Sequence, residues 1–540
     1  MTDKQPIFIL PENIQRIMGR DAQRNNIMAA RMVADTIKTT LGPKGMDKML
    51  VNNIGDIIIT NDGVTILEEM EIEHPAAKML VEVAKTQEDA VGDGTTTAVI
   101  LAGKLLENAE KLLDKKIHPT VIARGYRIAA ELSQELLQDI STKIGKDSLL
   151  LRSIASTAMT GKGAETSKDI LSDIVVKAVT QVMEEKDGKY IVDLNNVKLE
   201  KRKGGGIEDS ELIKGIVLDK EKVHSDMPSV VKNARIALLD TALEIKAPET
   251  DTKISISSPE QLQAFLDQEE RTLKSMVQQI KASKANVVIC QKGIDDVAQY
   301  YLTKEGIYGL RRVSKSDMEK LSKATGAKIV SNIHELTEKE LGNAETVEEV
   351  KEGSEEGVTY ITGCVNPKAL TILIRGGTEH VIDEIERAIK DALGDVAAAL
   401  QDGKIVSGGG AVETELAKRL REKGQVLKGR EQLAVQEFAS ALDSIPSILA
   451  ENAGLDPIDM LTELKAIHET EKGKNFGIDV YNGKIEDMMI KGVIEPLRIK
   501  TQAIKSASEV AMMLLRIDDV IASGKGGMMP PSQPMGMGEE

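Results

Sequence analysis

The sequence GDGTTT, from Gly92 to Thr97, combines residue types that suit a phosphate-binding turn. Its glycines let backbone N–H groups approach a ligand closely, and Thr95 to Thr97 can cap a helix that begins there. A helix N-terminus attracts phosphate, whereas the carboxylate of Asp93 repels it unless a cation lies between them. Asp93 is therefore a candidate Mg²⁺ ligand, because Mg²⁺ takes one or two carboxylates together with phosphate oxygens. An ordinary threonine-capped helix start explains the same residues.

Two other places in the sequence present carboxylates that could orient a water molecule. The β-branched run before Asn61-Asp62-Gly63 and the apolar stretch after it indicate a hairpin that carries Asp62 at its tip, although such tips are usually only solvated. Asp391 and Asp395 are four residues apart and share one face of a predicted helix, where like charges are mildly destabilising. The spacing alone does not decide which of these two acids faces a site.

The segment LGPKG, from Leu41 to Gly45, ends another predicted helix. Gly42-Pro43 stops that helix and Gly45 adds a second flexible point, so a helix stop followed by a turn accounts for the segment. The chain contains neither GxxxxGK[ST] nor GxGxxG. A nucleotide site in this protein would therefore be of another kind than the P-loop or the dinucleotide fold.

Composition excludes several classes of protein. A net charge of -16 with almost no aromatic residues argues against a nucleic-acid partner. No apolar run is long enough to span a membrane, and the N-terminus is too polar for a signal peptide. Cys290 and Cys364 are the only cysteines and the six histidines are scattered, which excludes a disulfide framework and a thiolate metal site. We expect a soluble protein of a reducing compartment, the cytoplasm.

The sequence predicts mainly helical segments near both ends of the chain and alternating strands and helices between them. Apolar residues at helical spacing predict helices near both ends of the chain, over residues 26–41, 76–90, 96–113, 120–137, 412–420, 431–442 and 501–521. Short apolar runs in the middle (IALLD, NVVIC, AKIV and TILIR) predict buried strands, and a long helix is expected over residues 379–400. With 540 residues, several domains are required. The pattern predicts a split domain whose insert enters and leaves through glycine joints, for which 161–163, 204–206, 376–377 and 408–410 are candidates.

Two more segments have a character of their own. Residues 258–281 predict an amphipathic helix that starts at Ser258-Pro259, preceded by the polar and extended stretch KAPETDTKISISS. This helix either packs on its own domain or forms an arm that docks elsewhere. The tail GKGGMMPPSQPMGMGEE is of low complexity, and we expect it to be flexible.

Five motifs in fixed order give the chain a resemblance to the chaperonins: LGPKG at Leu41, NDG at Asn61, GDGTTT at Gly92, KDAL at Lys390 and GGG at Gly408. Each motif is weak alone, but together they extend over most of the chain with the expected textures between them. The details are similar to a group II chaperonin of the archaeal thermosome type. The segment 234–296 resembles the built-in lid protrusion of that group, which replaces a separate cap protein.

The resemblance implies a multidomain α+β fold of three domains. A mainly helical equatorial ATP-binding domain would comprise residues 1–147 and 405–523. A small α/β intermediate hinge domain would comprise 148–217 and 370–404, and an α/β apical substrate-binding domain 218–369, with a helical lid protrusion over about 244–281. Residues 524–540 would form the flexible Gly/Met-rich tail.

The resemblance also assigns roles to single residues. It implies that Asp62 and Asp391 position the attacking water, with Asp391 preferred over Asp395 because it lies within KDAL, and that Asp93 binds the metal. Lys162 in TGKGAE resembles a lysine close to the γ-phosphate, and Asn61 receives no role. The remaining nucleotide contacts implied are Leu41, Gly42, Pro43, Gly92, Gly94, Thr95, Thr96, Thr97, Gly409, Gly410, Asn482, Gly483 and Glu495.

These assignments predict an ATPase with ATP and Mg²⁺ as cofactors. The chain would be a molecular chaperone that assembles with itself, or with related subunits, into stacked rings and encapsulates non-native polypeptides under a built-in lid. Hydrolysis would require closure of the hinge domain over the nucleotide. A small-molecule kinase or ATP-dependent ligase is the alternative, but the insert shows no acceptor site for it. A scaffold without turnover fits poorly with the presence of both Asp62 and Asp391. Neither nucleic acid nor membrane is an expected partner.

Overall fold

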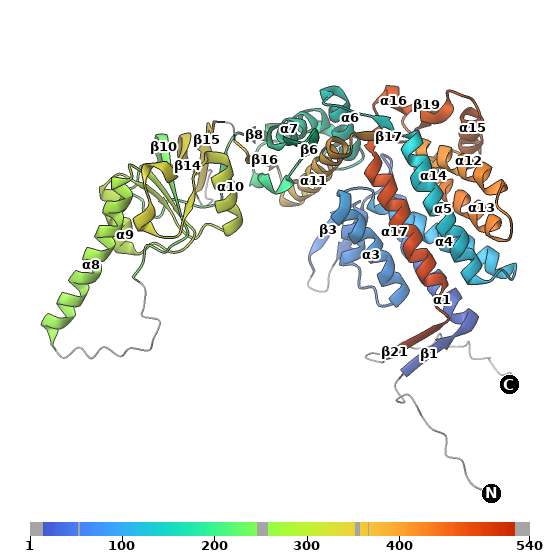
Figure 1. Ribbon diagram of the computed structural model, residues 1–540, viewed down its shortest axis with the longest axis horizontal. Coiled ribbons are helices and arrows are strands. Elements are labelled where there is room, and N and C mark those ends of the chain that lie inside the picture. Colours follow the sequence, from blue (N-terminus) through green and yellow to red (C-terminus); the bar gives the residue numbers. More distant parts are fainter. Residues whose placement is uncertain (1–13, 52–54, 246–257, 352–356, 366, 524–540) are drawn as a thin grey trace, which may run out of the picture. The chain divides into compact units, whose positions relative to one another are not determined.

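The computed structural model describes residues 14–51, 55–245, 258–351, 357–365 and 367–523. The chain forms two compact units (Figure 1). The first unit comprises Met1–Thr142 with Ile405–Glu540, so both ends of the chain contribute to it, and the second comprises Lys143–Lys404. The predicted division into three domains stays a prediction. The expectations for the stretch after Ile245 and for the tail fall on residues 246–257 and 524–540, which lie outside the described residues.

The first unit is mainly helical. Its helices are α1 (Gly19–Ile37), α2 (Gly63–Glu69), α3 (Pro75–Val91), α4 (Thr95–Asp114), α5 (Pro119–Ile140), α12 (Ala411–Gln425), α13 (Glu431–Leu442), α14 (Ser444–Asn452), α15 (Pro457–His468), α16 (Met488–Lys491) and α17 (Leu497–Leu515). Its short strands are β1 (Ile14–Met18), β2 (Lys48–Val51), β3 (Ile57–Thr60), β17 (Lys404–Ser407), β18 (Phe476–Asp479), β19 (Lys484–Asp487), β20 (Ile494–Pro496) and β21 (Asp519–Ser523), while β4 (Thr142–Lys143) lies at the unit boundary.

Helix α4 lies at the centre of this unit and packs against α1, α3, α13 and α17 (Figure 1). Its apolar residues occur on all sides, which is the pattern of a helix buried in a core. The core is built almost entirely from aliphatic and alanine side chains. Its main aromatic contact is an edge-to-face pair between Tyr126 and Phe438, whose ring centroids are 5.7 Å apart. The Tyr126 hydroxyl donates to the carbonyl oxygen of Leu105 at 2.7 Å, which satisfies the polar end of a fully buried ring.

Two predictions about the bounds of helices and strands in this unit are wrong. The predicted helix over 501–521 ends at Leu515, and its last residues form β21, which pairs antiparallel with β1. The predicted hairpin around Asn61-Asp62-Gly63 is displaced, because β2 and β3 form the hairpin and Asp62 follows β3. Asp62 instead caps the N-terminus of α2, a role that an aspartate before an apolar stretch suits equally well.

The described part of the second unit contains a three-stranded sheet, a seven-stranded sheet and a two-stranded hairpin, with helices packed on the first two. The smaller sheet has the order β7 (Val197–Lys203), β16 (Leu370–Gly376) and β8 (Glu211–Ile213), with β7 and β16 parallel. Helices α7 (Lys168–Val182) and α11 (Glu379–Asp402) pack on it, α6 (Ser148–Met159) packs against both of these helices, and β5 (Glu184–Lys186) and β6 (Lys189–Ile191) form a separate hairpin.

The larger sheet is mixed and carries the strands predicted from IALLD, NVVIC and AKIV, whereas TILIR forms β16 of the smaller sheet. Its order is β12 (Tyr308–Leu310), β11 (Val287–Cys290), β10 (Val230–Leu239), β14 (Gly342–Val350), β15 (Val358–Thr362) and β9 (Ile216–Leu218), with β13 (Ile329–Val330) beside β10. Helices α8 (Pro259–Ala282), α9 (Asp296–Lys304) and α10 (Lys315–Thr325) complete this part. Strands β10, β11 and β12 are parallel, whereas β14, β15 and β9 run antiparallel to their neighbours.

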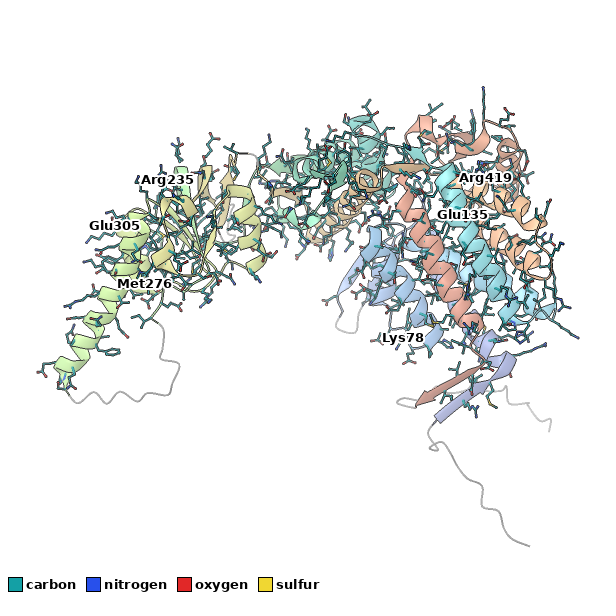
Figure 2. The ribbon with its side chains drawn as sticks, in the orientation of Figure 1. Lys78, Glu135, Arg235, Met276, Glu305 and Arg419 are labelled. Carbon is teal, nitrogen blue, oxygen red and sulfur yellow. The ribbon has the colours of Figure 1, made fainter. Side chains whose placement is uncertain are left out.

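Helix α8 is the predicted amphipathic helix, and Ser258 caps it by accepting from the backbone N–H of Gln261. Only the C-terminal half of α8 packs on the sheet, where Leu273 and Val277 are buried and Met276 is partly buried (Figure 2). Phe265 and Leu266, nearer its N-terminus, are 42% and 49% exposed. The helix therefore both packs on its own domain and extends beyond it (Figure 1).

Candidate functional site

The Gly-Asp-Gly turn joins α3 to α4 with two glycines in the left-handed conformation. Gly92 ends α3 with φ of 96°, and Gly94 occupies the N-cap position of α4 with φ of 80°. No side chain caps α4, so the prediction that a threonine caps this helix is wrong. The physical reason is that Thr95 is already the first helical residue. The backbone N–H groups of the first turn of α4 can therefore serve a ligand, as phosphate sites at helix N-termini do.

The turn is fixed from beneath by α3 and α17. The buried side chain of Gln87 donates from Nε2 to the carbonyl oxygens of Asp93 at 2.8 Å and of Ile499 at 3.3 Å. A Cβ atom at Gly94 would lie 2.6 Å from Cγ2 of Ile499 and 3.0 Å from Nε2 of Gln87. Both the backbone angle and this close approach therefore require glycine at position 94.

Asp62 lies beside the start of α4. Its Oδ2 accepts from the backbone N–H of Thr65 at 2.9 Å and from the Thr65 hydroxyl at 2.7 Å, and the Thr95 hydroxyl lies 3.4 Å from its Oδ1. A Cβ atom at Gly63 would lie 2.7 Å from Oγ1 of Thr96, which shows how closely the starts of α2 and α4 approach. The structure thus brings Asp62 together with Thr95 and Thr96, 33 and 34 residues further along the chain.

The LGPKG segment is held against α4 and α14. Leu41 packs with Ile100 of α4 and with Leu449 of α14. The side chain of Asn452 donates from Nδ2 to the carbonyl oxygens of Lys38 and Leu41, both at 2.9 Å. Gly42 has φ of 80°, and a Cβ atom there would lie 2.3 Å from Cδ2 of Leu449. Pro43 follows directly in the same loop.

The second glycine turn, Gly408 to Gly410, connects β17 to α12. Gly409 and Gly410 have φ of 64° and 79°. The Gly408 N–H donates to the carbonyl oxygen of Val493, and the Gly409 carbonyl oxygen accepts from the N–H of Ile478, both at 2.9 Å. These bonds place the turn between the segment that precedes β20 and strand β18.

The hairpin formed by β18 and β19 carries Asn482 and Gly483 in its turn. Asn482 donates from Nδ2 to Oδ2 of Asp479 at 2.8 Å, and the Gly483 N–H donates to the Asp479 carbonyl oxygen at 2.9 Å. The ammonium group of Lys44, in the LGPKG segment, lies 5.0 Å from the centre of the Tyr481 ring. The hairpin turn therefore lies beside the LGPKG loop.

Sequence reasoning missed two charged residues next to Glu495. In β20, Glu495 pairs with Val406 of β17, and its Oε2 lies 2.8 Å from Nζ of Lys500. The same ammonium group lies 2.9 Å from Oε1 of Glu413. Burial raises the pKa of Glu495, the charge of Lys500 opposes this, and the negative charges of Glu413 and Asp93 add to the rise. The position of Glu413, three residues after the Gly408–Gly410 turn, was the only signal in the sequence.

Lys162 and Asp391 belong to the second unit. Lys162 follows the end of α6, and its ammonium group forms an ion pair with Oδ2 of Asp391 on α11. The two side chains are 17% and 11% exposed. Asp395 lies one turn further along α11 and is 1% exposed. The structure thus pairs two of the predicted site residues that are 229 positions apart in the sequence.

The residues around Asp93 suit a cation that also contacts phosphate. Within the described ranges, no group of three or more His, Cys, Asp or Glu side chains could hold a metal ion by itself. Magnesium sites in nucleotide-dependent proteins need only one or two carboxylates, since phosphates and water supply the other ligands. Asp93 follows Gly92 in the turn before α4, so its carboxylate can supply one such ligand beside the backbone N–H groups of that helix.

Of the helices in the described part of the chain, none is both long enough and apolar enough to cross a bilayer.

Comparisons with known proteins identify the family. The profile of the TCP-1/cpn60 chaperonin family matches residues 33–525. A thermosome subunit of Methanopyrus kandleri is 62% identical over 522 residues, which covers 96% of this chain and 95% of the relative. The thermosome subunit alpha of Thermoplasma acidophilum is 58% identical over 540 residues, covering 100% of this chain and 98% of the relative. The chain therefore belongs to the TCP-1/cpn60 chaperonin family.

A solved structure places the chain within a group of that family. The open-state monomer of a group II chaperonin from Methanococcoides burtonii shares 49% sequence identity, with a TM-score of 0.58, over 79% of this chain and 100% of that one. The resemblance to group II chaperonins of the thermosome type and the predicted chaperonin fold are confirmed. Family membership also confirms the predicted function of an ATP-dependent chaperone and does not favour the kinase or ligase alternative.

Proposed function

We propose that the chain hydrolyses MgATP and uses this reaction to encapsulate non-native polypeptides in a double-ring cavity with a built-in lid. The observation that carries the proposal is the convergence, in the first unit, of two glycine turns and a carboxylate. The Gly-Asp-Gly turn and Asp62 meet at the start of α4, and α17 connects that turn to the strand that carries Glu495. Family membership supports the use of a nucleotide at such a site.

The residues of the first unit would bind and orient ATP. Gly92, Gly94 and the first helical residues Thr95 to Thr97 offer backbone N–H groups to the phosphates, because no side chain caps α4. Leu41, Gly42 and Pro43 would pack against the nucleotide. Gly409 and Gly410 would approach the ribose, Glu495 would accept a hydrogen bond from its hydroxyl groups, and the turn at Asn482-Gly483 would contact the base.

Asp93 would hold the magnesium ion. When bound, Mg²⁺ neutralises charge that develops on the phosphates during transfer to water. Asp62 would orient the attacking water, and its two bonds to Thr65 fix the direction of its carboxylate. Asp391 would be the second carboxylate and Lys162 a cation near the γ-phosphate. Since Asp391 and Lys162 belong to the second unit, hydrolysis would depend on how the two units are arranged.

Two exposed ribbons support self-association into rings. Strands β1 and β21 form one two-stranded sheet and β2 and β3 another, and an isolated pair of strands is marginally stable in water. On the second ribbon, the cross-strand pairs Met49–Ile59 and Val51–Ile57 consist of side chains that are 42–64% exposed. Such apolar edge strands suit pairing with another subunit. Cys290 and Cys364, both buried and without a disulfide, suit the cytoplasm.

The test measures assembly, turnover and folding on one preparation of the full chain. We expect particle images to show stacked rings, phosphate release to require Mg²⁺, and a denatured test protein to regain activity only with ATP. A monomer or simple dimer in the images would contradict the ring proposal. Rings that release no phosphate would contradict the ATPase proposal, and phosphate transfer to a small-molecule acceptor would favour a kinase.

A further inference from the structure

Lys500 forms the centre of a buried charge cluster in the first unit. The residue is 7% exposed, and its Nζ lies 2.9 Å from Oε1 of Glu413 and 2.8 Å from Oε2 of Glu495. The side chain of Glu413 is 5% exposed, whereas that of Glu495 keeps 19% of its surface accessible. Glu413 thus holds the lysine from the interior of the unit, whereas the carboxylate of Glu495 can still be reached by a ligand.

The three residues come from three segments that surround the second glycine turn. Glu413 lies in the first turn of α12, directly after Gly408 to Gly410. Glu495 is the central residue of β20, and Lys500 lies in the first turn of α17. A Cβ atom at Gly408 would lie 2.9 Å from Oε1 of Glu495. The Glu495 carboxylate is therefore held between Lys500 on its Oε2 side and the glycine turn on its Oε1 side.

The same part of α17 is also tied to the first glycine turn. Ile499, the residue before Lys500, accepts from Gln87 through its carbonyl oxygen, and the same Gln87 amide donates to the carbonyl oxygen of Asp93. The side chain of Ile499 lies against Gly94. Lys500 consequently occupies the point at which the segments of both glycine turns meet α17.

Stability alone does not account for a cluster of three charged side chains at this place in the core. Taking a lysine out of water is costly, and a buried ion pair often contributes no more stability than apolar side chains of similar volume. Burial alone would lower the pKa of Lys500, but the charges of Glu413 and Glu495 and their hydrogen bonds raise it above its usual value. The lysine therefore stays charged, and the geometry of Glu495 depends on it.

We propose that Lys500, anchored by Glu413, is a positioning residue that aims the Glu495 carboxylate at a ribose hydroxyl of the bound nucleotide. This inference rests on the proposed function, which places ATP at the two glycine turns. A carboxylate aimed in this way accepts a hydrogen bond from the 2′- or 3′-hydroxyl group. A site built to bond a hydroxyl group strongly rejects the analogue that lacks it. Lys500 would thus determine how well the protein distinguishes ribonucleotides from deoxyribonucleotides.

The experiment compares binding of ATP, 2′-deoxyATP and 3′-deoxyATP to the assembled full-length protein. We expect the wild type to bind ATP about 10-fold or more tightly than at least one of the deoxy analogues. Glu495→Gln and Lys500→Met should each reduce this ratio to within about 3-fold, and the double variant should reduce it no further, because the two residues act as one unit. Lys500→Arg, which keeps the charge, should recover part of the ratio.

Arg421→Met is the matched control. Arg421 is also on α12, further along the helix than Glu413, and pairs with the buried carboxylate of Asp443. This substitution should lower the thermal unfolding midpoint and leave the ratio of affinities unchanged. Should Lys500→Met fail to fold, Glu413→Gln tests the same idea, since it leaves both Lys500 and Glu495 in place and should still reduce the ratio.

Two results would overturn the inference while the proposed function stands. In the first, the wild type binds ATP and both deoxy analogues equally well. In the second, Lys500→Met lowers the unfolding midpoint but keeps the wild-type ratio, which would make the cluster purely structural. Absence of any ATP binding by the wild type would instead overturn the proposed function together with the inference.

Discussion

The ammonium group of Lys162 forms an ion pair with the carboxylate of Asp391, between the loop that follows α6 and the middle of α11. Both side chains lie mostly in the interior of the second unit. A buried pair of this kind is held in one geometry and costs desolvation free energy. Lys162 therefore holds the Asp391 carboxylate in one orientation, and its positive charge could also attract a phosphate group.

Asp391→Asn should slow ATP hydrolysis strongly without weakening ATP binding. Loss of a group that positions or activates water lowers kcat by about 10²-fold or more, whereas the proposed nucleotide contacts other than Lys162 lie in the first unit. Phosphate release and calorimetric ATP binding, measured on the same particles, would check both parts.

Asp383→Asn is a matched control for that experiment. Asp383 is also on α11, and its carboxylate pairs with Lys201 at 2.8 Å near the surface. This variant should hydrolyse ATP at close to the wild-type rate, because exposed ion pairs contribute little. Normal turnover by Asp391→Asn would remove Asp391 from the mechanism.

Gly94→Ala should weaken ATP binding by about 10-fold or more. The substitution forces a non-glycine residue into φ of 80° and places its Cβ 2.6 Å from Cγ2 of Ile499, so the turn must move. Gly454→Ala provides the comparison, since Gly454 has a similar φ of 72° but nothing within 4 Å of its would-be Cβ. The control should lose stability through backbone strain alone and keep its ATP affinity. Equal affinity in both variants would contradict a phosphate site at this turn.

The long helices and buried strands could be predicted because their patterns are local. Helix α11, for example, carries a continuous apolar stripe from Ile382 to Leu400, and the structure has it over Glu379–Asp402. Asp62 shows where local reasoning fails. A β-branched run followed by Asn-Asp-Gly is typical of a hairpin, yet the same Asp can cap a helix, and packing against the start of α4 decided between the two.

The site illustrates the same limit. The glycine turns and the acids near them stand out by composition, and the structure brings Asp62 to Thr95 across 33 positions. The sequence does not mark Lys500 and Gln87 as site residues, because a lysine or glutamine within a helical pattern is expected to face the solvent. Their burial follows only from the way α17 packs between the two glycine turns.

Glu415→Gln should destabilise the protein at neutral pH and much less in acid. Burial alone would raise the pKa of Glu415, but hydrogen bonds from His468 and Arg419 outweigh it and hold the pKa below its usual value. The resulting stabilisation is fully present above the unfolded-state pKa of about 4.3 and is lost as the pH falls through the lower folded-state pKa. At pH 7 the substitution should cost about 1–3 kcal/mol.

Thermal unfolding at pH 7, 5, 4 and 3 would test this dependence. The difference between wild type and Glu415→Gln should narrow below about pH 4. Glu184→Gln serves as the control, since Glu184 pairs with Lys368 on the surface and its loss should leave the unfolding midpoint nearly unchanged. A pH-independent difference for Glu415→Gln would show that the charge of this carboxylate does not contribute.

Ile59→Lys should prevent ring assembly while leaving the subunit folded. Ile59 is 42% exposed on the ribbon of β2 and β3, opposite Met49, and a charge there opposes burial against a neighbouring subunit. Sedimentation should show mostly monomer where the wild type forms large particles. Ile458→Lys replaces an isoleucine that is 75% exposed on α15, outside both ribbons, and should assemble normally. Rings formed by Ile59→Lys would rule out this ribbon as a subunit contact.

Replacing Phe265 and Leu266 together by serine should separate encapsulation from ATP hydrolysis. The two side chains are 42% and 49% exposed on the half of α8 that extends beyond its sheet, so their loss removes little packing within the chain. The unfolding midpoint and phosphate release should stay close to wild type. If α8 contributes to the lid, protection of a bound test protein from protease should fall by about 10-fold, because an apolar contact between closing lids would be lost.

Leu273→Ala tests the other half of the same helix. Leu273 is 2% exposed in the core beneath α8, and its truncation should cost about 2–5 kcal/mol of stability. The two variants should therefore show opposite effects. The serine variant should lose protease protection and keep its unfolding midpoint, whereas Leu273→Ala should lower the unfolding midpoint. Full protease protection by the serine variant in the presence of ATP would place the lid contact elsewhere on the protein.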